Sequence, residues 1–354
     1  MKKPFPSASM MKVEEIRSIL VIHQGALGDF ILALPAMETL RETFPRAKLV
    51  LMGFPRILEL VNQRFYADEI LSVDQRGMAS FFVRGSPFDQ PLAQYFGTFD
   101  VLAVFGKDGE GTLTGNLKQI CKGLVLHINP FPQWIERIHL TDHLLRELSR
   151  YGFPPSEKIP RLFLSEKDKD WGKTFCRMKG ITPEEKSKAI VVHPGSGSKK
   201  KVWPLDRFLE LIHYFQARFN SRIFIVLGPA EGPEVQKAFG GIEWELGVAA
   251  PLLVKGLSLV ELASVMEGCQ VFIGNDSGIT HMAAALGIPT IAIFGPSDHK
   301  IWSPRGEKVF VARKEMRCSP CSEERFVQCK HGDCLRELGV KDVLEGIKEL
   351  RIPL

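Results

Sequence analysis

The chain has 354 residues, of which 45% are hydrophobic and 25% are charged, and its formal net charge is +5. This length favours two domains of about 150 residues each, and the ordinary composition excludes a disordered or low-complexity protein. The modest positive charge does not require a nucleic-acid partner, and no apolar run approaches the roughly 20 residues of a membrane span.

The N-terminal segment contains no uninterrupted apolar run of signal-peptide length before His23, Gln24 and Asp29. The cysteines number seven, and an odd count without a secretion signal favours reduced thiols over a disulfide framework. We therefore expect a cytoplasmic protein, with peripheral contact at a membrane surface left open.

Short apolar runs alternate with helix-length segments in the first half of the chain. Such runs, buried on both faces, indicate a parallel sheet wrapped by helices. The predicted strands are 19–23, 48–53, 69–73, 100–106 and 123–128. Residues 1–160 are therefore predicted to form a doubly wound α/β domain.

A helix over 141–153 closes this domain, and a proline-marked, charged connection follows over 154–171, with the boundary near 158–167. The same alternation returns in a second domain, 161–335. Its predicted strands are 189–195, 222–228, 269–275 and 290–295. Residues 336–354 contain an amphipathic helix whose docking place stays open.

The first candidate site is the loop GALGDF, which directly follows the first predicted strand. Gly25 and Gly28 suit a loop that approaches a ligand closely, but the GxGxxG spacing of a dinucleotide site is absent, which disfavours a nicotinamide enzyme. Asp29 has two interpretations that the sequence leaves equal. It caps the following helix, or it is a carboxylate that takes a proton from an incoming hydroxyl.

The second candidate is HPGSGSKKKVWP, where a strand ends in a glycine and serine loop. Backbone amides and the Ser196 hydroxyl can cradle phosphate oxygens while one lysine neutralises charge. Lys201, nearest the next helix, is the lysine we select. Lys199 and Lys200 are interpreted as a solvated basic turn.

The third candidate is LGPAEGPE, again at a strand end. Glu231 either accepts the ribose hydroxyls of a nucleotide, as acidic residues do beyond strands of nucleotide-binding folds, or is an ordinary residue of a surface turn.

The fourth candidate is GNDSGITH, where Asp276, Ser277 and Gly278 form a turn between a buried strand and a helix. The first amides of a helix lack partners within it, and the positive end of the helix dipole lies behind them, so this turn can hold a phosphate. His281 lies one helical turn below Ser277, where a lone histidine is more often structural.

Two patterns suggest a metal, and we favour neither. Asp168, Lys169 and Asp170 match a DxD pattern, but we interpret them as a solvated helix face. The later segment CSPCSEERFVQCKHGDC offers Cys318, Cys321, Cys329 and Cys334. Only its first pair has the spacing of a zinc site, so reduced packing thiols are favoured over structural zinc. No metal and no cofactor are therefore expected.

In this order and at these separations, the glycine loop, the lysine loop, the GNDSG turn and the CSPC segment resemble glycosyltransferase family nine, the ADP-heptose:lipopolysaccharide heptosyltransferases. The resemblance implies a GT-B architecture, in which two Rossmann-like domains face a central cleft. It also implies an inverting enzyme that holds the acceptor in its N-terminal domain and the donor in its C-terminal domain.

By matching positions, the resemblance makes Asp29 the general base, with Gly25 and Gly28 in the acceptor loop. Lys201 and Ser196 would contact the donor diphosphate, and Glu231 would face the ribose. The remaining donor-binding residues would be Asp276, Ser277, Gly278 and His281.

The implied partners are ADP-heptose and a lipid-linked lipopolysaccharide core acceptor. The implied location is the cytoplasm, with peripheral contact at the inner face of the inner membrane. Three alternatives stay open: a GT-B enzyme that uses another nucleotide sugar, a nucleotide-sugar epimerase, and a non-catalytic nucleotide-sugar binding protein. A zinc-stabilised nucleic-acid binder is disfavoured by the modest charge.

Overall fold

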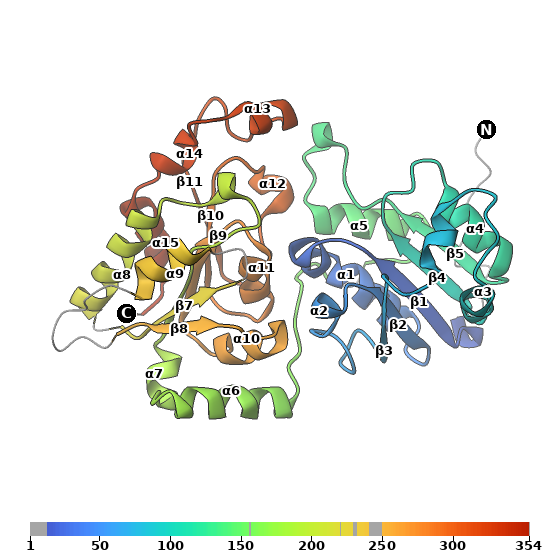
Figure 1. Cartoon of the computed structure of the whole chain (residues 1–354), viewed down its shortest axis with the longest axis horizontal. Helices are drawn as coiled ribbons and strands as arrows, with labels where there is room; N and C mark the ends of the chain where they lie inside the picture. Colours follow the sequence, from blue (N-terminus) through green and yellow to red (C-terminus); the bar gives the residue numbers. More distant parts are fainter. Residues whose placement is uncertain (1–12, 156, 220, 229–231, 241–249, 354) are drawn as a thin grey trace. The chain divides into compact units, whose positions relative to one another are not determined.

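The computed structural model describes residues 13–155, 157–219, 221–228, 232–240 and 250–353. The chain divides into two compact units, Met1–Phe163 and Leu164–Leu354. Figure 1 draws the first unit in blue to green and the second in green to red, and each unit has its own sheet.

The first unit contains a five-stranded sheet of order β3-β2-β1-β4-β5, in which every neighbouring pair is parallel. Its strands are β1 (Ser18–His23), β2 (Lys48–Gly53), β3 (Glu69–Ser72), β4 (Val101–Phe105) and β5 (Leu124–Ile128). The five predicted strands are confirmed. Since β1, β2 and β4 are buried along nearly their whole length, they read as continuous apolar runs in the sequence.

Helices connect these strands. They are η2 (Val13–Glu15), α1 (Leu27–Thr43), α2 (Pro55–Leu58), η3 (Met78–Phe82), α3 (Gln90–Phe96), α4 (Thr112–Ile120), η4 (Trp134–Glu136) and α5 (Leu140–Ser149). Helix α1 is buried from Phe30 to Leu40 and packs against α5, so its N-terminus has a fixed position at the end of β1.

Aromatic rings attach the end of the first unit to its body. The Phe163 ring lies 5.2 Å from that of Phe65 and 5.9 Å from that of Tyr66, between centroids, and the Tyr66 hydroxyl donates to the Arg161 carbonyl at 3.0 Å. The division between the two units follows Phe163, where these contacts end.

The second unit contains a six-stranded parallel sheet of order β11-β10-β9-β6-β7-β8. Its strands are β6 (Ile190–His193), β7 (Ile223–Leu227), β8 (Leu252–Lys255), β9 (Val271–Asn275), β10 (Thr290–Phe294) and β11 (Val309–Arg313). The sequence predicted the four central strands and missed β8 and β11. Both missed strands lie at sheet edges and are only partly buried, although residues 252–254 and 309–312 are apolar runs.

The helices of this unit are α6 (Glu166–Met178), α7 (Pro183–Ser187), η5 (Lys199–Lys201), α8 (Leu205–Phe219), α9 (Pro233–Gly240), α10 (Leu259–Met266), α11 (Gly278–Ala285), α12 (His299–Trp302), α13 (Glu323–Gln328), α14 (Asp333–Arg336) and α15 (Val340–Glu349). In the described ranges, no helix is long and apolar enough to cross a membrane.

Helix α15 packs on the second sheet and on α8, which places the C-terminal segment in the core of the second unit. Val343 and Ile347 are buried in that core. A Cβ added at Gly346 would lie 2.7 Å from the Phe310 ring and 2.9 Å from Ile291, so the close approach of α15 to the sheet requires glycine there.

The Asp168 to Asp170 triplet lies in the first turns of α6 and serves that helix. Ser165 caps α6, and the Asp168 carboxylate accepts from the Ser165 amide at 2.8 Å. Asp170 pairs with Lys173 across 3.0 Å, and both side chains are largely exposed. This is the solvated helix face that the sequence predicted.

Candidate active site

Asp29 lies in the first turn of α1, directly after the end of β1. Its carboxylate accepts a hydrogen bond from the Ala26 amide at 3.3 Å, which satisfies one of the donors at the helix start. Gly28 precedes it as the second residue of the helix. Asp29 therefore caps α1, and it also lines a cavity at the carboxyl end of the sheet, so its two predicted interpretations are compatible.

Gly25 and His23 form the wall beside Asp29. A Cβ at Gly25 would lie 2.7 Å from the His23 ring and 2.9 Å from the Asp29 Cβ, so only glycine fits between them. The Gly25 amide donates to His23 Nδ1 at 3.2 Å, which makes that nitrogen an acceptor. Burial lowers the pKa of His23 to about 4, so the imidazole is neutral near pH 7.

The cavity beside Asp29 has a volume of about 240 Å³. Phe105, Leu140 and Leu144 give it an apolar side, and Lys107 supplies a cation. The Lys107 ammonium lies 5.4 Å from the centroid of the Phe131 ring, within the range of a cation–π contact. Lys107 and Phe131 were not predicted from the sequence, although Lys107 follows β4 at the strand edge where ligands of such sheets bind.

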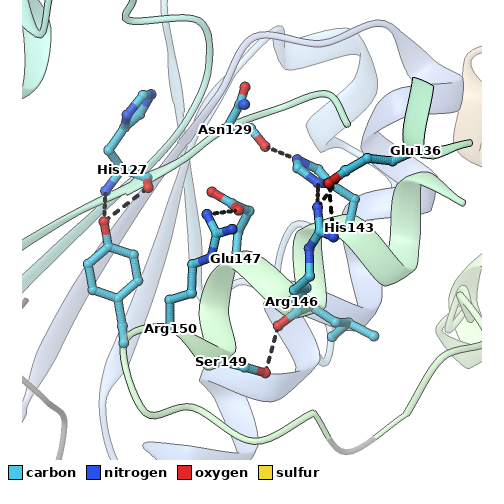
Figure 2. A network of polar contacts seen from close by, with 10 residues as sticks. His127, Asn129, Glu136, His143, Arg146, Glu147, Ser149 and Arg150 are labelled. Carbon is cyan, nitrogen blue, oxygen red and sulfur yellow. Dashed lines mark hydrogen bonds and ion pairs between the residues drawn. The ribbon is translucent and has the colours of Figure 1, made fainter. Parts of the chain in front are cut away.

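A polar network fixes the loop that carries Phe131 (Figure 2). His143 Nε2 lies 2.9 Å from the Asn129 carbonyl, and its Nδ1 lies 3.2 Å from an Arg146 nitrogen. Because a carbonyl only accepts, Nε2 carries the proton, in accord with a pKa of His143 that burial lowers. Arg146 also binds Glu136 at 2.8 Å. Residues 129–136 are thus bonded at both ends to α5.

In the second unit, three predicted donor-site residues come together where β6 and β9 end. Lys201 Nζ lies 2.9 Å from Asp276 Oδ2, in an ion pair whose carboxylate is buried and whose ammonium is about one-third exposed. The Ser196 hydroxyl donates to the Asp276 carbonyl at 2.7 Å. The lysine loop and the GNDSG turn are therefore bonded directly to each other.

The GNDSG turn leads into α11 as predicted. Ser277 is the N-cap and accepts from the Thr280 amide, and Gly278 is the first helical residue. The amides of Gly278 and Ile279 precede the first bonded amide of α11, that of Thr280, and have no acceptor within the helix. His281 is buried one turn further along α11, and its amide donates to the Ser277 carbonyl at 3.3 Å.

Two buried side chains, those of Asn275 and Trp203, hold the loop that carries Lys201. Asn275 Nδ2 donates to the Pro194 carbonyl at 2.7 Å, while its Oδ1 accepts from the Trp203 amide at 3.0 Å. The fully buried Trp203 ring donates to the Leu338 carbonyl at 2.9 Å. Lys201 therefore lies between Pro194 and Trp203, two points at which core side chains hold its loop. The sequence analysis missed Asn275, whose role depends on contacts between distant segments.

Lys200 is not a simple solvated side chain, because its ammonium donates to the carbonyls of Phe326 and Val327 at 2.5 Å and 2.7 Å. Glu231 lies outside the described residues.

All seven cysteines are free thiols, and the clustered ones differ in exposure: Cys318 and Cys329 are exposed and Cys334 is buried. Burial raises the pKa of Cys334 to about 11, with smaller contributions from the thiols of Cys321, Cys318 and Cys329. In the part of the chain that the structure describes, no group of three or more His, Cys, Asp or Glu side chains could hold a metal ion.

Comparison with known proteins identifies a family. The model of glycosyltransferase family 9 (heptosyltransferase) matches residues 125–331. Lipooligosaccharide heptosyltransferase 2 of Campylobacter jejuni subsp. jejuni serotype O:2 is 29% identical, over 92% of this chain and 95% of that protein.

Two solved structures have the same fold at low identity. The glycosyl transferase family 9 protein of Veillonella parvula matches with a TM-score of 0.75 and 21% identity, over 94% of this chain and 97% of its own. The ADP-heptose lps heptosyltransferase II of E. coli matches with a TM-score of 0.71 and 19% identity, over 94% and 98%. The predicted GT-B class of two parallel-sheet α/β domains is confirmed.

Proposed function

Since the chain belongs to glycosyltransferase family 9, the heptosyltransferase family, we propose that it transfers heptose from ADP-heptose to a saccharide of the lipopolysaccharide core. The name of its full-length relative in Campylobacter jejuni supports the sugar and the acceptor class. The ADP-heptose named for the E. coli structure of the same fold supports the donor. In this proposal the second unit binds the donor and the first unit binds the acceptor.

The Lys201–Asp276 ion pair at the start of α11 is the main support for the proposed donor site. It puts a cation beside helix amides that lack partners within the helix, and the two together suit a diphosphate. Lys201, Ser196, Ser277 and Gly278 are proposed to contact the diphosphate. Asp276 is proposed to contribute to donor binding by orienting Lys201, because an anion that pairs with the lysine does not itself bind another anion.

His281 and Glu231 complete the proposed donor site. The buried His281 supports α11 below the phosphate contacts. Glu231 lies outside the described residues and keeps its proposed contact with the ribose hydroxyls.

On the acceptor side, Asp29 is proposed as the general base. The acceptor hydroxyl loses its proton to the Asp29 carboxylate, and its oxygen forms a bond to the anomeric carbon of the heptose. The bond from that carbon to the diphosphate oxygen breaks, and ADP leaves with the electron pair. Attack opposite the leaving group inverts the anomeric carbon. Lys201 and the α11 amides stabilise the charge of the leaving group.

Contact with a lipid-linked acceptor at a membrane surface is proposed for η4. Trp134 and Ile135 are each 76% exposed on that short helix. Tryptophan favours the boundary between membrane and water because its ring is apolar and its N–H is polar. The same loop carries Phe131 of the cavity beside Asp29, so lipid contact there would bring the acceptor close to the proposed base.

The test of this function is transfer itself. Purified protein is incubated with ADP-heptose and a core saccharide, and the product is analysed by mass spectrometry and by NMR of the new anomeric centre. The proposal expects addition of one heptose with inverted configuration. Parallel reactions with other nucleotide sugars test the donor. Transfer from another donor, with none from ADP-heptose, would contradict the proposal.

A further inference from the structure

A second hollow lies beside the Asp29 cavity in the first unit. It is an open groove of about 550 Å³, which is within the usual range for small-molecule sites. Gln24 lines both the groove and the cavity. The two spaces therefore share one lining residue, which would lie beside a ligand that extends from the cavity into the groove.

Three neighbouring strands place side chains in this groove. Gln24 follows β1, Phe54 follows β2, and Asp74 and Gln75 come shortly after β3, in the sheet order β3-β2-β1. Phe82, at the end of η3, forms a further part of the wall. Because the carboxyl ends of parallel strands share one edge, the groove lies at the same edge of the sheet as the first turn of α1, which carries Asp29.

The lining combines apolar rings with uncharged and acidic polar groups. Phe54 is 38% exposed and Phe82 is 41% exposed, so both rings offer apolar surface to the groove. Asp74 accepts hydrogen bonds, and the amides of Gln24 and Gln75 donate and accept them. Flat apolar faces with a few such groups suit a sugar ring, which has an apolar C–H face and a rim of hydroxyls.

The groove also carries a polar atom that needs a partner. Gln75 Nε2 is buried and makes no hydrogen bond in the described part of the chain. Leaving a buried amide donor unpaired is unfavourable. Because this atom is buried, a hydroxyl of a bound ring would supply the acceptor only after the Gln75 amide turns toward the groove.

The groove and the cavity differ in the charge of the side chains that line them. Among the described residues that line the groove, none is a cation, and Asp74 would repel a carboxylate or phosphate. The cavity beside Asp29 contains Lys107 instead. An anionic group on the acceptor therefore fits the cavity, while the groove favours an uncharged ring.

We infer that the groove is a second acceptor subsite, which binds an uncharged sugar ring next to the sugar that receives the heptose. This inference rests on the proposed function and adds to it that the acceptor has at least two rings. A ring bound between Phe54, Phe82 and the polar side chains would contribute affinity without taking part in the reaction.

The test measures acceptor binding without donor, by isothermal titration or ligand-observed NMR, so that its result does not depend on catalysis. Three probes are compared: a single acceptor sugar, the same sugar linked to an uncharged ring, and the same sugar linked to a sugar acid. For the intact protein we expect about tenfold tighter binding of the uncharged disaccharide than of the single sugar, which corresponds to about 1.4 kcal/mol. The sugar acid should give no such gain.

Phe82→Ala and Asp74→Asn should remove most of this gain and leave binding of the single sugar and of ADP-heptose unchanged. Tyr214→Ala, which removes a similarly exposed aromatic side chain in the second unit, is the matched control. Equal affinity for all three probes, or a gain that both groove variants keep, would overturn the subsite. An intact protein that shows the gain but transfers no heptose would contradict the proposed function and leave the subsite supported.

Discussion

The ammonium of Lys201 lies 2.9 Å from the buried carboxylate of Asp276, although the two residues come from loops at the ends of different strands. The pair exists because β6 lies next to β9 in the second sheet, so the loops that follow them meet at the same edge. It orients a cation at the start of α11. The corner is therefore preorganised for an anion before a donor arrives.

Lys201→Ala should weaken ADP-heptose binding by one to two orders of magnitude, because the phosphate loses a charge-assisted contact worth about 1.5–3 kcal/mol. Asp276→Asn should weaken it less, because the lysine remains but loses its anchor. The double variant should cost less than the sum of the two singles, as expected for residues in contact. Isothermal titration measures all three, and full additivity would contradict the coupling of the pair.

Asp29→Asn should lower the turnover number by about 10²–10⁴-fold while ADP-heptose affinity is unchanged, since general-base catalysis contributes about that much. Asparagine keeps an oxygen that can accept from the Ala26 amide, so the cap of α1 is preserved. Asp29→Ala should lose transfer as well and also cost about 0.5–2 kcal/mol of stability through the lost cap. Turnover near that of the intact protein in Asp29→Asn would remove Asp29 from the base role.

Stability should fall as the pH is lowered from about 6.5 to about 4, in part because of His23. Its pKa is 6.5 when unfolded and about 4 when folded, so in this window the unfolded chain binds a proton that the folded chain excludes. Above pH 6.5 the imidazole is neutral in both states and its contribution to stability is fully present. The loss reaches about 3 kcal/mol at most.

The comparison for His23 is His23→Asn, whose side-chain oxygen can take the place of Nδ1 as acceptor for the Gly25 amide. Urea unfolding at several pH values gives the free energy of unfolding for both proteins. The variant should show a shallower decline below pH 6.5. Parallel declines would show that His23 does not titrate as its burial implies.

Replacing Trp134 and Ile135 together with serine should reduce binding to anionic lipid vesicles several-fold, because the two exposed apolar side chains are the proposed membrane contact. Co-sedimentation with vesicles measures the bound fraction. Met178→Ser, which removes an 80% exposed apolar side chain in the second unit, is the control and should bind like the intact protein. Heptose transfer to a soluble core saccharide should not change in either variant, so a loss there would point to damage of the nearby cavity instead.

The sequence predicted the elements whose signals are local. Buried central strands such as β1 and β9 appear as continuous apolar runs, and the starts of α1 and α11 follow from the residues around Asp29 and Ser277. The edge strands β8 and β11 were missed although residues 252–254 and 309–312 are apolar, because periodicity alone does not tell so short an apolar run from a buried helix segment. Helix α15 was predicted, but its docking against Ile291 was not, since an amphipathic pattern does not specify which surface covers it.

For the candidate site, the sequence alone determined which loops follow strands and which of their residues can hold phosphate or take a proton, because these properties depend on neighbours along the chain. The tertiary structure decided that Lys201 pairs with Asp276, that Lys200 binds α13 instead, and that Lys107 shares a cavity with Asp29. The physical reason is the order of the strands. Sheet order determines which loops meet at one edge, and it depends on packing between segments far apart in the chain.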